Sequence, residues 1–116
     1  MPRTANFTVI SDGWSAAKRF DFQLPESLDI GSRLVLGFML DPDIGGEAEV
    51  RFMLNAEAVW RWKFSADDHG AARFFQEVIP AGIARAGANR LELEVVVPSA
   101  DAVLTSDIVL WWHENL

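Results

Sequence analysis

The sequence predicts an all-β protein in which about eight short antiparallel strands form a sandwich or a barrel. Apolar and polar residues alternate along several short segments, and Gly, Pro, Asn and Asp gather between those segments. No segment has the apolar spacing of a long helix. Since 50% of the 116 residues are hydrophobic, we expect one domain spanning residues 1–116 with a substantial core.

Four strands are expected in the first half of the chain. The first is rich in β-formers and ends at a Ser-Asp-Gly turn, and the second alternates phenylalanine and leucine with polar residues. The third is apolar on both faces and runs into a loop of Asp, Pro and Gly, and the fourth has the clearest period of two. These strands are predicted at residues 5–10, 17–24, 33–40 and 47–54.

Four more strands are expected in the second half. A tight turn at residues 55–57 leads into a strand that places Trp60, Trp62 and Phe64 on one face, which we expect to lie in the core. Residues 80–87 begin with Pro and end with Gly, which predicts one short helical turn. The strands are predicted at residues 59–65, 73–79, 89–97 and 105–114.

The segment around Gly87 and Asn89 resembles part of the galactose-binding-like jelly-roll domains, which include many carbohydrate-binding modules. In those domains a short turn, the sequence Gly-x-Asn and an alternating strand commonly follow one another, and a hairpin with an asparagine, here Asn55, often precedes them. Residues 105–108 are similar to the closing strand of the family. The resemblance implies an antiparallel β-sandwich of jelly-roll type.

The charge and composition of the chain exclude several classes of partner. The net charge is −7 and the ten basic residues are scattered, so we expect no nucleic acid and no membrane surface as a partner. The apolar runs are too short to span a bilayer. The first residues lack the apolar segment of a secretion signal, which predicts a cytoplasmic protein, although exported proteins also fit. The absence of cysteine excludes disulfides and thiolate chemistry.

The adjacent pair Trp111 and Trp112 is the main functional signal in the sequence. Successive side chains of a strand point to opposite faces, so Trp112 can enter the core only if Trp111 does not. Val109 and Met39 are expected to share the second face with Trp111. An exposed apolar face of this kind is typical of an interaction surface, and a second copy of the chain is the commonest partner.

Other residues are candidates for a ligand or metal site. Trp14 follows a glycine turn and His113 lies near the end of the last strand, so both are candidate ligand or interface residues. Asp41 and Asp43 precede two glycines and supply oxygen ligands at alternate positions, which makes them a weak candidate calcium site. A solvated turn is the alternative interpretation of that segment. His69 has two acidic neighbours but is more typical of a charged loop.

Three functions fit these observations. The first is a non-catalytic binding or assembly module whose second sheet face contacts a protein, with a second copy as the expected partner. The alternative from another class is a carbohydrate-binding module that uses Trp111 or Trp14 as a stacking platform. A small hydrolase with loop carboxylates is a third hypothesis, but no nucleophile, phosphate-binding or paired-acid motif is recognisable, so we expect no enzyme activity.

Overall fold

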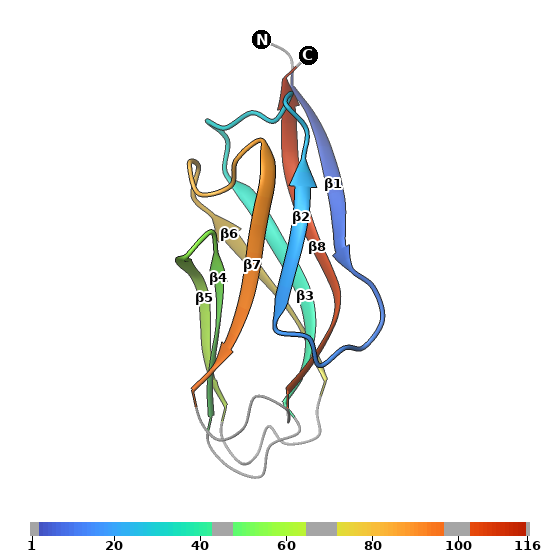
Figure 1. The fold of residues 1–116 in the computed structure, drawn as a ribbon, viewed down its shortest axis with the longest axis vertical. Coiled ribbons are helices and arrows are strands. Elements are labelled where there is room, and N and C mark those ends of the chain that lie inside the picture. Colours follow the sequence, from blue (N-terminus) through green and yellow to red (C-terminus); the bar gives the residue numbers. More distant parts are fainter. Residues whose placement is uncertain (1–2, 43–47, 65–71, 97–102, 116) are drawn as a thin grey trace.

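Two antiparallel sheets pack face to face in the computed structural model, which describes residues 3–42, 48–64, 72–96 and 103–115 (Figure 1). Within those residues there are eight strands. They are β1 (Arg3–Ser11), β2 (Arg19–Leu24), β3 (Leu34–Pro42), β4 (Ala48–Leu54), β5 (Glu57–Phe64), β6 (Arg73–Ile79), β7 (Gly87–Val95) and β8 (Val103–Asn115). None of the described segments forms a helix with the length and apolar character needed to cross a membrane.

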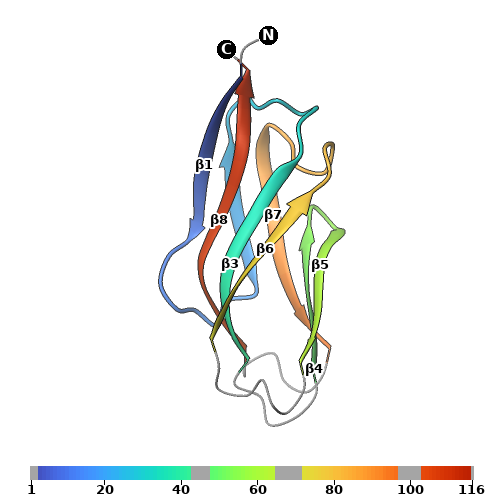
Figure 2. The same cartoon turned by 180° about the vertical axis from the view of Figure 1, so that it is seen from behind.

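The order of the strands explains which edges of the sandwich are open. Sheet A has the order β1-β8-β3-β6, and sheet B has the order β2-β7-β4-β5. Figure 2 shows sheet A in front of sheet B. The sequence neighbours β5 and β6 therefore belong to different sheets, and each is an edge strand. The predicted antiparallel sandwich of jelly-roll type is confirmed, with strand positions close to those expected from the alternation.

The predicted helical turn at residues 80–87 is wrong. This connection between β6 and β7 is a series of bends and turns, with Gly82 and Gly87 at φ values of 93° and 86°. Positive φ at Gly82, inside the segment, is incompatible with a right-handed helix that continues through it. Positive φ at Gly87 is what a glycine at the end of a helical turn would also adopt. A proline at the start of a segment and a glycine at its end are typical of a helical turn and of an irregular connection alike. The sequence signal was therefore ambiguous.

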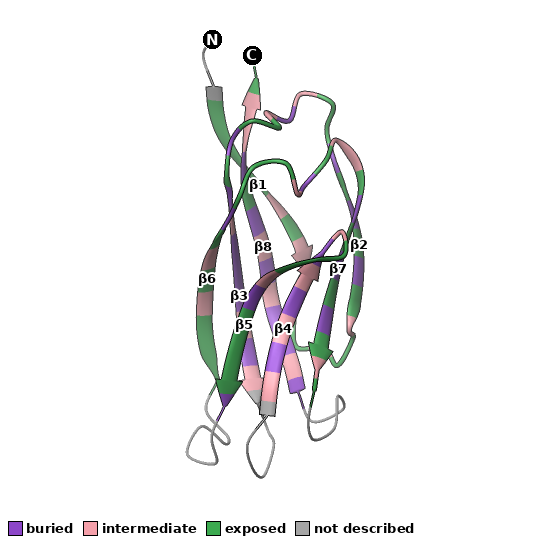
Figure 3. Cartoon of the chain, turned by 90° about the vertical axis from the view of Figure 1, so that its left-hand side faces the viewer, coloured by how far each residue is buried: buried purple, intermediate pink, exposed green. Residues whose placement is uncertain are grey.

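The core lies between the two sheets, where alternate residues of most strands are buried (Figure 3). Phe38 is fully buried and lies at the centre of an aromatic cluster. Its ring centroid is 4.6 Å from that of Phe52, 4.8 Å from that of Trp60 and 5.6 Å from that of Phe75. Edge-to-face and offset contacts at these separations are the favoured geometries of aromatic pairs. The cluster therefore joins β3 of sheet A to β4 and β5 of sheet B.

Two asparagines fix the turns at one end of sheet B. Asn55 and Ala56 have φ values of 50° and 69°, as in the type I′ turns that connect tight hairpins. The Asn55 side chain donates to the carbonyl of Ile83 and to the side-chain oxygen of Asn89, and it accepts from the N–H of Arg90. The β4–β5 hairpin is thus tied to the β6–β7 connection by side-chain hydrogen bonds, which explains why asparagine occupies both positions.

A bulge changes the face on which β8 residues lie. Asp107 has a φ of 52°, and the register between β3 and β8 shifts between Gly37 and Met39. One extra residue in β8 moves the inward positions from odd to even numbers. Thr105 is buried before the bulge, and Trp112 is buried after it, whereas Trp111 points outward. The predicted separation of the two tryptophans is confirmed.

The outer face of sheet B carries an ion pair that gives one pH prediction. Nε of Arg90 lies 2.9 Å from a carboxylate oxygen of Asp21, its register partner across β2 and β7. The hydrogen bond from Arg90, with its charge and that of Arg19, lowers the pKa of Asp21 below the usual range of aspartate, and the pKa of Arg90 is raised. A carboxyl with a lowered pKa in the folded state adds stability above its ordinary pKa, and that contribution is lost as the pH falls through the lowered value.

We therefore expect an NMR titration of Asp21 to give a midpoint below the usual aspartate value of about 3.9. Arg90→Gln should raise that midpoint, because it removes both the hydrogen bond and the nearest positive charge. The matched control is Arg51→Gln, which breaks the separate ion pair of Arg51 with Glu94 and should leave Asp21 unchanged. An ordinary midpoint for Asp21 in the unaltered chain would contradict the prediction.

Candidate functional site

An aromatic cleft opens at the edge of the sandwich between β5 and β6. Both are edge strands on the same side of their sheets, and no backbone ladder joins them in the described residues. The inner faces of the two sheets are therefore accessible along this edge. The cleft has a volume of about 470 Å³, which is within the usual range of small-molecule sites. It is lined by Ala58, Val59, Trp60, Arg61, Trp62, Phe75, Gln76 and Glu77.

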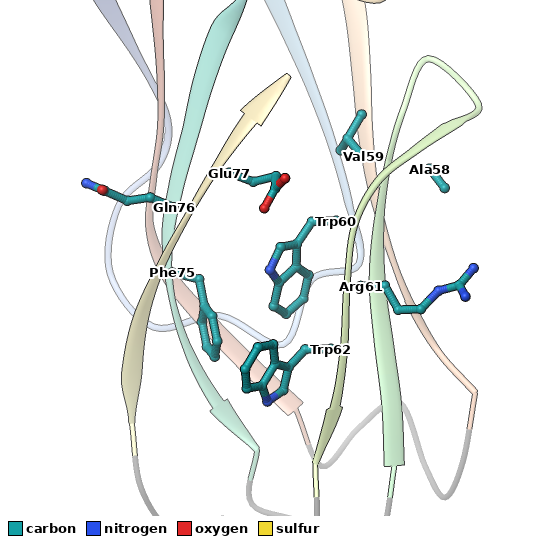
Figure 4. Close-up of a pocket in the computed structure, with 8 residues that line it drawn as sticks. All are labelled: Ala58, Val59, Trp60, Arg61, Trp62, Phe75, Gln76 and Glu77. Carbon is teal, nitrogen blue, oxygen red and sulfur yellow. The ribbon is translucent and has the colours of Figure 1, made fainter. Parts of the chain in front are cut away.

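Three aromatic rings form the apolar part of the cleft (Figure 4). Trp60 and Trp62 lie two residues apart on β5, so both point to the inner face. Phe75 comes from β6, and its ring centroid is 5.0 Å from that of Trp60 and 5.4 Å from that of Trp62. Trp60 is buried, whereas Trp62 keeps 41% of its surface exposed. The wall therefore runs from the core out to solvent without an interruption in its aromatic character.

One carboxylate faces these rings. Figure 4 shows the Glu77 side chain directed into the cleft beside Trp60, while the side chains of Gln76 and Arg61 point away. Glu77 follows Phe75 by two residues on β6, which explains why both are on the inner face. A carboxylate at the rim of an apolar cleft can accept hydrogen bonds from hydroxyl or amide groups of a ligand. The cleft can thus hold a flat, partly apolar ligand that carries hydroxyl groups.

Trp62 lies on the inner face of its sheet, as predicted, but the prediction that it is buried in the core is wrong. Trp62 pairs with Val50 across β5 and β4, and Val50 is fully buried on the same inner face. The difference arises because β5 is an edge strand that sheet A does not cover at this position. Periodicity reports which face a residue lies on, but it does not report whether an opposing strand is close enough to bury it.

The predicted second-face residues lie together on the outer side of sheet A. Trp111, Val109 and Met39 all point outward, and Trp111 is 37% exposed. A Cβ atom added to Gly37 would come within 2.6 Å of the Trp111 ring, so the ring lies directly over this glycine. We call the outward apolar side chains of this sheet the outer apolar face. Its members are Phe7, Val9, Val35, Met39, Phe74, Val78, Val109 and Trp111.

The remaining predicted site residues do not converge on one site. Trp14 is exposed in the connection between β1 and β2. His113 is half-buried, with an Nδ1 atom that has no hydrogen-bond partner, and it lines a polar depression with Arg33. Asp41 lies at the end of β3 with one buried carboxylate oxygen that lacks a partner.

The calcium hypothesis is not tested by the described part of the chain. Asp43 and His69 lie outside the described residues. Within the described ranges no group of three or more His, Cys, Asp or Glu side chains is placed to hold a metal ion. Calcium at Asp41 and Asp43 therefore stays a prediction from the sequence.

Sequence reasoning missed Phe75, Glu77 and the exposed part of Trp62. The available signal was the presence of three aromatic residues on one face of a single strand, because aromatic side chains line ligand sites as well as cores. The long connection from residue 65 to residue 72 was a second signal, since strands joined by more than a tight turn are often not hairpin partners. Together they indicate an aromatic strand at an open edge.

Comparisons with solved structures support the fold. Dimeric latent PorU from Porphyromonas gingivalis matches with a TM-score of 0.73 and 15% identity, over 98% of this chain and 13% of PorU. The sugar-binding EclA C-terminal domain matches with a TM-score of 0.56 and 9% identity, over 95% of this chain and 79% of that domain. A family 35 carbohydrate-binding module from an environmental isolate matches with a TM-score of 0.55 and 11% identity, over 100% and 98% of the two chains.

These likenesses concern architecture, because none of the three identities exceeds 15%. The chain has the jelly-roll β-sandwich fold seen in carbohydrate-binding modules, and it spans about an eighth of the length of PorU. No protein-family model matches the sequence. The comparison with curated proteins found no match.

Proposed function

We propose that this chain is a non-catalytic carbohydrate-binding module that holds a sugar in the aromatic cleft between β5 and β6. The observation that carries the proposal is the exposed ring of Trp62, which continues the wall formed by the buried Trp60 and the partly buried Phe75, with the Glu77 carboxylate beside Trp60. The presence of two sugar-binding proteins among its structural neighbours supports the same class of ligand.

The chemistry of the cleft matches the two kinds of surface on a pyranose. One face of the ring presents C–H groups, which pack against an aromatic face, and the rim presents hydroxyl groups, which need hydrogen-bond partners. Trp62 and Phe75 supply the aromatic surface, and Glu77 supplies an acceptor. Because Trp60 is held in the core by Phe38, the wall is preorganised and loses little side-chain entropy when a ligand binds.

The same geometry disfavours hydrolysis. Glycoside hydrolysis in its common form uses two carboxyl groups on either side of the scissile bond, about 5 to 10 Å apart. Among the described residues that line the cleft, Glu77 is the only acid. A lone carboxylate can orient a hydroxyl group, but it cannot serve as both acid and base partner of that reaction.

A titration of the intact chain with xylohexaose, cellohexaose and mannohexaose, followed by calorimetry and tryptophan fluorescence, tests the proposal. We expect one of these glycans to bind and to shift the emission of the cleft tryptophans. Trp62→Ala should raise the dissociation constant about tenfold or more, because the stacking surface is lost. Glu77→Gln should weaken binding by a smaller factor, since the amide keeps one acceptor oxygen and loses the charge.

Trp14→Ala is the matched control, because Trp14 is also exposed and lies outside the cleft. It should bind the glycan as the unaltered chain does, and so should Trp111→Ala. If one of these controls lost glycan binding while Trp62→Ala still bound, the sugar would stack on the control residue and the cleft proposal would be wrong. Absence of binding to all three glycans in the unaltered chain would contradict the proposal.

A further inference from the structure

We propose that the outer apolar face of sheet A binds a second copy of this chain, so that two sandwiches pack face to face about a two-fold axis. This surface is on the opposite side of sheet A from the core, and it does not overlap with the inner face that lines the aromatic cleft. The inference therefore does not depend on the carbohydrate proposal.

The register of sheet A shows that the apolar side chains form a continuous row. Phe7 of β1 pairs with Trp111 of β8, Trp111 pairs with Val35 of β3, and Val35 pairs with Val78 of β6. Directly paired residues lie on the same side of a sheet, so one apolar row crosses all four strands. The next row contains Val9, Val109 and Gly37 and ends at the polar Gln76 of β6. The first row, which is apolar across all four strands, is not explained by the core of its own subunit.

The row is also accessible. Phe7 is 60% exposed and Val78 is 54% exposed, and these two residues lie at opposite edges of the sheet. Figure 2 looks onto this side of the sheet, and no described segment crosses it. Contiguous exposed apolar patches larger than a few hundred Å² are rare on monomeric proteins and usually mark interaction sites.

The size and shape of the face fit another sheet. The strands of sheet A contain 9, 13, 9 and 7 residues. At about 3.4 Å per residue and about 4.8 Å between strands, the face has a footprint on the order of 600 Å², which is at the lower end of the range of about 600 to 1,000 Å² per partner of a standard interface. The ring of Trp111 lies over Gly37, where a glycine leaves room for it, and so lies down against the sheet. Two such faces can approach to the spacing of about 10 Å that stacked sheets adopt.

The charge distribution and residue sizes favour a second copy as the occupant. The chain carries a net charge of −7, yet the apolar row from Phe7 to Val78 contains no charged residue, so two copies can meet there without burying like charges. With the two-fold axis along the strands, the bulky Phe7 of one copy lies opposite the smaller Val78 of the other. Such self-complementarity is what a two-fold interface requires.

Light scattering behind size exclusion, with the intact chain loaded from about 1 to 300 µM, tests this inference. We expect the mass to rise from that of one chain to that of two across the series. Phe7→Asp and Val78→Asp should each raise the dimer dissociation constant about tenfold or more, because a charge is then buried in the interface. Both positions are exposed in a single subunit, so circular dichroism and thermal melting should show folded monomers.

Ile30→Asp is the matched control, since Ile30 is an equally exposed apolar residue in the connection between β2 and β3. It should dimerise as the unaltered chain does. A single-chain mass at every concentration would overturn the inference, and a dimer that both face variants leave intact would overturn it too. Glycan binding by a monomer would leave the cleft proposal standing while this one fails.

Discussion

Phe38→Ala is expected to lower the free energy of unfolding by about 4 kcal/mol, because a fully buried aromatic ring is lost at the centre of the core. Phe38 contacts the rings of Phe52, Trp60 and Phe75, so the cavity would lie between the two sheets. The measurement is urea denaturation followed by circular dichroism. The same change should weaken glycan binding, since two of the three cleft rings pack against Phe38.

The matched control is Phe7→Ala, which removes the same ring from an exposed position of β1. It should change the free energy of unfolding of the monomer by about 0.5 kcal/mol or less. Equal effects of the two substitutions at a concentration where the chain is monomeric would contradict the central position of Phe38 in the core.

Asn89→Ala is expected to lower the free energy of unfolding by about 3 kcal/mol, because it leaves several partly buried polar groups without a partner. The Asn89 amide donates to the carbonyls of Arg85 and Gly87, at 2.7 and 3.1 Å, and its oxygen accepts from the N–H of Arg85 at 3.0 Å. The oxygen also accepts from the side chain of Asn55 at 2.9 Å. Alanine can replace none of these four bonds, and the groups that lose them are partly buried.

Asn6→Ala is the control for this substitution, since Asn6 is exposed and its oxygen accepts from the N–H of the adjacent Phe7. We expect its effect to be within about 0.5 kcal/mol. The role of Asn89 in stability would be supported if the denaturation curves of the two variants had the same slope and the Asn89→Ala curve had the lower midpoint. An unchanged midpoint for Asn89→Ala would show that the turn network does not stabilise the fold.

The fold was largely predictable because strand alternation is a local property. Phe20, Phe22 and Leu24 alternate with polar residues, and the structure buries all three. The sequence places Asn55 and Asn89 beside turns, and the structure adds the reason, which is that their side chains form a hydrogen bond with each other. Alternation along a strand does not indicate which distant strands pair. The order of strands in the two sheets is therefore known only from the structure.

The candidate site was not predictable for the same physical reason. Trp62 has the same inward orientation as Trp60, and only its place at an open edge of the sandwich leaves it exposed. Glu77 becomes a cleft residue because β6 lies across from β5, a relation between two sheets. The exposure of Trp111, in contrast, followed from its adjacency to Trp112, because two neighbouring residues of a strand cannot enter one core.

The pairing of the first and last strands has a mechanical consequence. Arg3 pairs with Asn115, and the described ends of the chain lie together at one tip of the sandwich (Figure 1). A force that pulls these two ends apart acts along the hydrogen bonds between antiparallel β1 and β8, which lie across the strands. The bonds would then break one pair at a time, as in a zipper, and not all at once under shear. A tether attached at both ends would open this protein at low force, beginning with the strand that carries Phe7.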